Sequence, residues 1–166
     1  MARIMQVSDS VMIKADPAEL WEEIADPTQM PRWSPENTGA TTPSSSGPLQ
    51  AGDVFDGTNR RGPATWVTEC VVTDSVPGKR FAFTVRRIGR RTPSIEGANA
   101  SWAYEFEDLG EVTRVTESWT DDRRGWPDWL AWAFDHIVTR GRSFADFQRL
   151  NIRRTLTALK DDFEQR

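Results

Sequence analysis

Glu117 is the residue whose position in the sequence most suggests chemistry. It lies between Val115 and Trp119 in a segment of alternating polar and apolar residues, which predicts a strand with these three side chains on its inward face. A carboxylate on an inward face must be paired, hydrated or protonated, because burying an unpaired charge is costly. Glu117 could therefore orient a ligand or exchange a proton, or it could form a structural ion pair with an arginine.

Aromatic side chains dominate the strand face that Glu117 is expected to share. The eight Trp and eight Phe residues could build a plain core or line an apolar pocket. Such pockets carry a few placed polar groups, and Asn59, Thr68, Tyr104 and Glu117 fit that description. The residues expected on the inward face are Phe55, Gly57, Asn59, Trp66, Thr68, Cys70, Val72, Phe81, Phe83, Val85, Trp102, Tyr104, Phe106, Val115, Glu117 and Trp119.

The last stretch of the chain, residues 143–166, supplies a second set of polar groups. It contains no Gly or Pro, and Ser143 can cap its N-terminus, so it predicts a long helix. Gln148, Asn151 and Thr155 fall on the same arc as its apolar positions. Either the helix closes over a cavity into which these groups point, or its apolar stripe drifts and leaves them at the edge. The apolar positions are Phe144, Phe147, Ile152, Leu156, Leu159 and Phe163.

Few other residues suggest a reactive or metal-binding site. His136 is the only histidine and Cys70 the only cysteine, so we expect no metal site and no cofactor. Cys70 is expected to be a small core residue rather than a nucleophile. If the chain is an enzyme, its acid and base must come from groups such as Glu117, Tyr104, Asn59 or His136.

The elements that must position these residues follow from periodicity and turn signals. Two short helices are expected after the first strand, beginning at Asp16 and Asp26, and residues 34–52 are expected to form a loop. The pattern predicts an α+β fold with a curved antiparallel sheet of about six or seven strands, whose concave face the final helix covers. The expected strands span residues 4–15, 53–60, 64–76, 80–88, 100–107 and 112–120.

The composition limits the classes of function. A length of 166 residues predicts one domain, residues 1–166, and a net charge of −4 argues against nucleic acid as the main partner. The single cysteine fits a reducing cytoplasm, which is the expected location. We expect no signal peptide and no membrane-spanning stretch. Either a monomer or a homodimer is compatible with the sequence.

Taken together, these segments resemble the START-like (SRPBCC) helix-grip superfamily, in particular its bacterial polyketide cyclase/dehydrase and lipid-transport branch. The resemblance extends over nearly the whole chain in the right order, and it is specific for fold rather than function. It implies a deep cavity between sheet and C-terminal helix that binds a lipophilic molecule, with Trp33 to Pro35 at its mouth. The matching segments are residues 15–21 (ADPAELW), 25–27 (ADP), 31–35 (PRWSP), 59–62 (NRRG), 77–83 (PGKRFAF), 102–104 (WAY), 113–119 (TRVTESW) and 155–160 (TLTALK).

These considerations give a candidate ligand-binding set but no assigned catalytic residue, because ring-closing members of the superfamily share no universal catalytic motif. Glu117 stays the single catalytic candidate. The candidate ligand-binding residues are Trp33, Phe55, Asn59, Trp66, Thr68, Phe83, Trp102, Tyr104, Glu117, Trp119, Phe147, Gln148, Asn151 and Thr155.

Three functions compete. The first is binding or transport of a hydrophobic small molecule such as a lipid, a polyketide or an aromatic metabolite. The second is a cyclase- or dehydrase-type enzyme without metal, in which Glu117 is acid or base while Tyr104 and Asn59 stabilise an enolate-like oxygen. The third is a regulatory protein, toxin-like or ribosome-associated, that uses the arginine cluster at residues 86–91.

The segment from Trp126 to His136 admits several interpretations. It contains Trp126, Trp129, Trp132 and Phe134, some of them at helical spacing. It is a lid over the cavity, a patch that contacts membranes transiently, or an additional amphipathic helix packed on the core.

Overall fold

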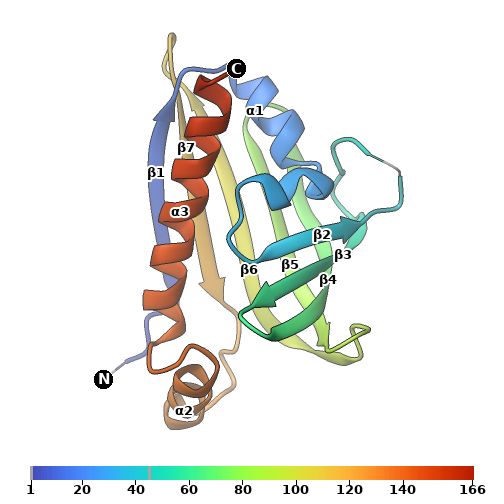
Figure 1. Ribbon diagram of the computed structural model, residues 1–166, viewed down its shortest axis with the longest axis vertical. Coiled ribbons are helices and arrows are strands. Elements are labelled where there is room, and N and C mark those ends of the chain that lie inside the picture. Colours follow the sequence, from blue (N-terminus) through green and yellow to red (C-terminus); the bar gives the residue numbers. More distant parts are fainter. Residues whose placement is uncertain (1, 45) are drawn as a thin grey trace.

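A curved antiparallel sheet forms the framework of the computed structural model, which describes residues 2–44 and 46–166 (Figure 1). Its seven strands follow the order β1-β7-β6-β5-β4-β3-β2, so the meander from β3 to β7 lies between two edge strands from the N-terminal part of the chain. This is the predicted α+β helix-grip arrangement. The strands are β1 (Gln6–Ile13), β2 (Asn37–Thr41), β3 (Val54–Arg61), β4 (Ala64–Val76), β5 (Arg80–Gly89), β6 (Ile95–Asp108) and β7 (Thr113–Asp121).

Three side chains cap the helices where the sequence predicts caps. Asp16 accepts a hydrogen bond from the Ala18 N–H, Asp26 accepts one from the Thr28 N–H, and Ser143 accepts one from the Asp146 N–H. Each bond satisfies an N–H group that has no partner within the helix itself. The helices are α1 (Pro17–Ile24), the 3-10 helix η1 (Pro27–Arg32), α2 (Asp128–Val138) and α3 (Phe144–Glu164).

Helix α3 lies along one side of the concave face, against β1 and β7 (Figure 1). Its residues Ile152, Leu156 and Leu159 are buried in the hydrophobic core. Polar contacts fix its C-terminal end: the Lys160 ammonium donates to the Met12 carbonyl oxygen at 2.7 Å, and the Lys14 N–H donates to Glu164 at 3.0 Å. The helix is therefore held by one half of the sheet, and strands β3 to β5 face it across the core.

Two element boundaries differ from the predicted ones. The predicted loop at residues 34–52 contains β2, which pairs with β3 from Asn37 opposite Asn59 to Thr41 opposite Asp56. This strand, NTGAT, has almost no apolar side chains to alternate, so only backbone pairing reveals it. Strand β6 begins at Ile95 rather than at residue 100, because its exposed first residues continue the hairpin with β5 beyond the buried sheet.

Candidate ligand-binding site

The centre of the candidate site is a hydrogen-bonded pair on neighbouring strands. The register of β6 and β7 places Tyr104 directly opposite Glu117, and the Tyr104 hydroxyl donates to Glu117 Oε1 at 2.9 Å. Both side chains are buried, and Glu117 is 2% exposed. Its second oxygen, Oε2, is also buried and has no hydrogen-bond partner. Among the described residues no arginine lies within ion-pairing distance of Glu117, so the predicted structural ion pair is not formed there.

Burial sets the protonation state of this pair. Loss of hydration raises the pKa of Glu117 from 4.5 to about 8, and the hydrogen bond from Tyr104 offsets only part of that rise. The pKa of Tyr104 is raised well above its ordinary value by burial and by the neighbouring carboxylate. Near neutral pH Glu117 is therefore mainly a neutral acid. Because Oε1 accepts from Tyr104, the Glu117 proton resides on Oε2, which is then a free donor.

The three polar residues on α3 face the interior. Gln148, Asn151 and Thr155 are all buried, and Asn151 Nδ2 donates to Gln148 Oε1 at 3.4 Å. Their burial excludes the alternative in which a drifting stripe leaves them at the edge in water. The helix face that packs on the sheet thus carries amides and a hydroxyl among its apolar residues.

Aromatic rings build the walls around this centre. Phe55 and Phe83 meet edge to face with ring centroids 5.3 Å apart, and Trp119 stacks on Phe144 of α3 at 6.4 Å. Such contacts fix ring orientation and add to the energy of burial. Trp33, at the end of η1, is buried as well. Trp102 is partly buried and packs against the same core.

The remaining candidates gather near the β3–β4 turn rather than around Glu117. Asn59 lies opposite Trp66 in the β3–β4 pair, and its amide donates to the Gly57 carbonyl oxygen at 3.2 Å and to Thr68 at 3.4 Å. Strands β4, β5 and β6 separate Asn59 from Glu117 in the sheet. The structure therefore joins Tyr104 with Glu117 as one hydrogen-bonded unit, whereas Asn59 bonds to Gly57 and Thr68.

Arg61 is a functional candidate that the sequence reasoning did not select. Its guanidinium carbon lies 3.9 Å from the ring centroid of Phe147 and 5.4 Å from that of Trp66. It also pairs with Glu36 and donates to the Val138 carbonyl oxygen at 3.0 Å. Arg61 thus joins the β3–β4 turn to α2 and α3. Strand alternation through Asn59 could have placed it on the inward face.

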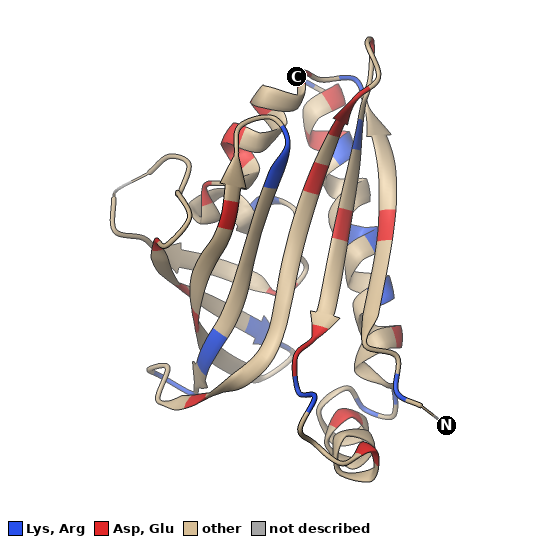
Figure 2. Cartoon of the chain, turned by 180° about the vertical axis from the view of Figure 1, so that it is seen from behind, with Lys and Arg blue, Asp and Glu red and all other residues tan. Residues whose placement is uncertain are grey.

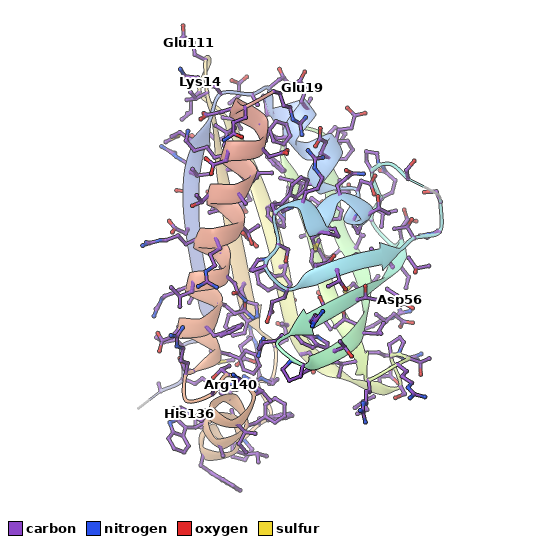
Figure 3. All side chains as sticks on the ribbon, viewed as in Figure 1. Lys14, Glu19, Asp56, Glu111, His136 and Arg140 are labelled. Carbon is purple, nitrogen blue, oxygen red and sulfur yellow. The ribbon has the colours of Figure 1, made fainter. Side chains whose placement is uncertain are left out.

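Two other reactive residues do not join the site. His136 lies on α2, where its ring packs against Trp132 with centroids 4.1 Å apart, at the end of the molecule (Figure 3). Cys70 is buried, and burial raises the pKa of its thiol to about 12, so it stays a thiol at neutral pH. The prediction that Cys70 is a core residue is confirmed.

Two hollows are found at the surface, and neither is lined by Glu117 or by the polar residues of α3. One, of about 240 Å³, lies on the outer face of the sheet among polar side chains such as Thr84 and Ser101. The other, of about 220 Å³, lies between the N-terminal segment and the start of α3, next to Arg3. The Glu117 side chain itself is buried, and a cavity between sheet and α3 stays a prediction.

Two further searches cover the described part of the chain. No cluster of three or more His, Cys, Asp or Glu side chains there is arranged to hold a metal ion. None of the helices between residues 2 and 166 is both long and apolar enough to cross a bilayer, residue 45 lying outside the description.

Comparison with solved structures shows that other proteins have this fold. Solved structures of similar shape include a START superfamily protein from Mycobacterium smegmatis (TM-score 0.67, 13% identity, 97% of this chain and 98% of the other covered). They also include protein CV1439 from Chromobacterium violaceum (TM-score 0.66, 11% identity, 97% and 99% covered). The Polyketide_cyc-like protein Cgl2372 from Corynebacterium glutamicum is 25% identical (TM-score 0.60, 99% and 94% covered).

No curated protein sequence matches significantly. The sequence profile of the family described as "Polyketide cyclase / dehydrase and lipid transport" matches residues 5–164, almost the entire chain. The profile covers every strand and helix described above, from β1 to α3. The chain therefore belongs to the polyketide cyclase/dehydrase and lipid-transport family of START-like helix-grip proteins.

Proposed function

We propose that this chain binds a hydrophobic small molecule that carries a hydrogen-bond acceptor, such as a ketone or ester oxygen, between the sheet and α3. The observation behind the proposal is the unpartnered Oε2 of Glu117 in an aromatic interior. Leaving a buried polar atom without a partner costs about 1–3 kcal/mol. A ligand oxygen that accepts from the protonated Glu117 would recover that energy, and the aromatic walls would bind the rest of the molecule.

A ligand can reach the interior only if side chains move. The contacts of Arg61, between the β3–β4 turn and the start of α3, are where we expect this movement. Arg61 lies over Phe147 of α3 while its ion pair with Glu36 is only partly buried. Partly exposed ion pairs contribute little to stability, so this contact can open at small cost. In this proposal the β3–β4 turn and the start of α3 separate to admit the ligand.

The test uses matched ligands and native mass spectrometry. The protein, purified without detergent, is titrated with a long-chain ketone and with the alkane of equal length. We expect the ketone to bind about tenfold more tightly, which corresponds to one hydrogen bond to a group that is otherwise unpartnered. A Glu117→Leu variant should lose that preference, and a Glu117→Gln variant, which keeps an N–H donor, should retain most of it.

A Glu111→Gln variant serves as the control, because Glu111 is exposed at the far tip of the β6–β7 turn (Figure 3). The proposal is wrong if neither ligand binds across a broad panel of chain lengths. It is also wrong if ketone and alkane bind equally well to the wild-type protein.

A second candidate function is catalysis of the cyclase or dehydrase type. The observation that favours it is the buried pair of Tyr104 and Glu117, in which burial raises the pKa of Glu117 to about 8 and so leaves a proton donor in the interior near neutral pH. With Tyr104 fixed on Oε1, Glu117 could protonate a carbonyl or enolate oxygen through Oε2. A short β-polyketone thioester is a suitable test substrate. Lost turnover with retained binding in Glu117→Gln supports catalysis, and unchanged turnover removes Glu117 from that role.

A further inference from the structure

Helix α2 presents its apolar side chains to solvent instead of to the core. Within the helix Ala131 and Asp135 are the buried residues. Trp129, Trp132 and Ile137 are 71%, 62% and 77% exposed. The helix projects from one end of the molecule, beyond the sheet and α3 (Figures 1 and 3). The helix contacts the rest of the molecule through Ala131, Asp135 and Phe134, whose ring stacks on Phe144 of α3 with centroids 6.4 Å apart.

A buried ion-pair network fixes this orientation. Arg123 donates to both oxygens of Asp121, at 2.9 and 2.8 Å, and to Asp135 of α2 at 2.9 Å. The second oxygen of Asp135 accepts from the Phe144 N–H at the start of α3, at 3.2 Å. The only strongly polar residue on the inner face of α2 is thus the one that attaches it. This attachment leaves Trp129 and Ile137 on the exposed side of α2, while Trp132, also exposed, lies beside the surface hollow that Asp135 lines.

The charge around α2 is opposite in sign to that of the whole protein. Arg124, Arg140 and Arg142 are exposed on either side of the helix, and Asp128 is the only exposed carboxylate within residues 124–142. Arg90 and Arg91 are exposed in the β5–β6 turn at the same end, with the exposed Glu96 beside them at the start of β6 (Figure 2). The chain as a whole has a net charge of −4. This end is therefore suited to an anionic partner.

A second copy of the chain fits these features poorly. A two-fold contact through α2 would bring the exposed arginines of both copies together, which is unfavourable. The helix has 11 residues and is about 16 Å long, so two such helices would bury much less than the roughly 800 Å² per partner of a stable interface. Indole rings on a projecting helix with flanking arginines suit the interface of a bilayer.

We propose that α2 docks on the surface of membranes that contain anionic lipids. Trp129, Trp132 and Ile137 insert between the headgroups, while Arg140 and Arg142 contact the phosphates. This inference does not depend on the proposed ligand site. Arg61 nevertheless connects the docking helix with the proposed ligand site. It donates to the Val138 carbonyl oxygen, the last of α2, and it lies over Phe147. Docking would thus bring the β3–β4 turn to the membrane surface.

The test is co-sedimentation with vesicles of phosphatidylcholine alone and with an equal mixture of phosphatidylcholine and phosphatidylglycerol. We expect binding to the mixed vesicles that weakens as salt is added. Replacing Trp129 and Trp132 together by Ser should weaken binding more than about tenfold, since two large apolar side chains no longer leave water. Replacing Arg140 and Arg142 by Gln should weaken it by about fivefold for each charge.

Leu109→Ser is the matched control, because Leu109 is an exposed apolar residue in the turn at the opposite end of the molecule. It should bind mixed vesicles as the wild-type protein does. All replaced side chains are exposed, so unchanged circular dichroism and denaturation midpoints verify the fold. The proposal is overturned if the wild-type protein stays in the supernatant with both vesicles, or if the tryptophan variant binds equally well. A dimer that the tryptophan variant abolishes in sedimentation velocity, without vesicle binding, would assign the surface to a second copy.

Discussion

Replacement of Glu117 by Gln should change how the stability of this protein depends on pH. In the folded state burial raises the pKa of Glu117 from 4.5 to about 8. Between these values the folded state holds a proton that the unfolded state has lost, so unfolding becomes easier as the pH rises. The favourable contribution of protonated Glu117 is fully present below about pH 4.5 and is lost as the pH increases toward about 8.

The magnitude follows from the size of the shift. Each pH unit in this window lowers the unfolding free energy by about 1.4 kcal/mol. The full interval between 4.5 and about 8 therefore lowers it by about 5 kcal/mol. That is a large share of the stability of an ordinary domain, about 5–15 kcal/mol. Glutamine cannot ionise, and it keeps a carbonyl that accepts from Tyr104. The variant should therefore be similar to wild type in acid and clearly more stable at about pH 8.

The assay is urea denaturation followed by tryptophan fluorescence at pH values from about 5 to 8. Other groups also titrate, so the quantity of interest is the difference in unfolding free energy between wild type and Glu117→Gln. That difference should change by about 1.4 kcal/mol per pH unit across the window. The exposed Glu111→Gln variant should give a flat difference. A flat difference for Glu117→Gln as well would mean that Glu117 is ionised in the folded protein, and the reasoning about Oε2 would fail.

Three further predictions concern the framework. Arg123→Met should lower the unfolding free energy by about 3–5 kcal/mol, because it leaves the buried Asp135 without an ion-pair partner and leaves Asp121 only its longer pair with Arg3 at 3.5 Å. Urea denaturation measures this, and a loss below about 1 kcal/mol would contradict it. Ser143→Ala should cost about 1 kcal/mol by removing the cap of α3, and thermal unfolding that matches wild type would refute that role. Cys70 should react with a thiol reagent only at the rate of unfolding, because its thiol is buried and its pKa is raised. Fast labelling of Cys70 under native conditions would contradict this and would show that the interior opens.

Strand alternation was enough to predict the inward face of the sheet. Phe55, Phe83 and Trp119 are buried as the pattern indicates, and the caps at Asp16 and Ser143 form as expected. These features could be predicted because each depends on residues close in sequence. The bond between Tyr104 and Glu117 depends on strand register, which a short β6–β7 connection constrains but which alternation alone does not give.

Other features depend on contacts that the sequence pattern does not encode. The outward-facing aromatic side of α2 resembles an ordinary buried stripe in the sequence, because periodicity does not tell which side of a helix meets solvent. The attachment of Asp135 to Arg123 and to the Phe144 N–H fixes which side faces the protein. Likewise, alternation shows that Asn59 points inward but not that three strands separate it from Glu117. Packing density between sheet and α3 is also a property of the three-dimensional arrangement alone.

The pairing of β1 with β7 has a consequence for how the chain folds. It joins Val11 to Val115, residues more than a hundred positions apart, whereas the hairpins from β3 to β7 join near neighbours. Contacts between distant parts of a chain form slowly because closing a long loop costs entropy. We expect the central hairpins to assemble first, and the two ends of the chain, β1 and α3, to join them last. Until that final step the aromatic face would be open to water, and a small apolar molecule present then could be enclosed as the chain completes its fold.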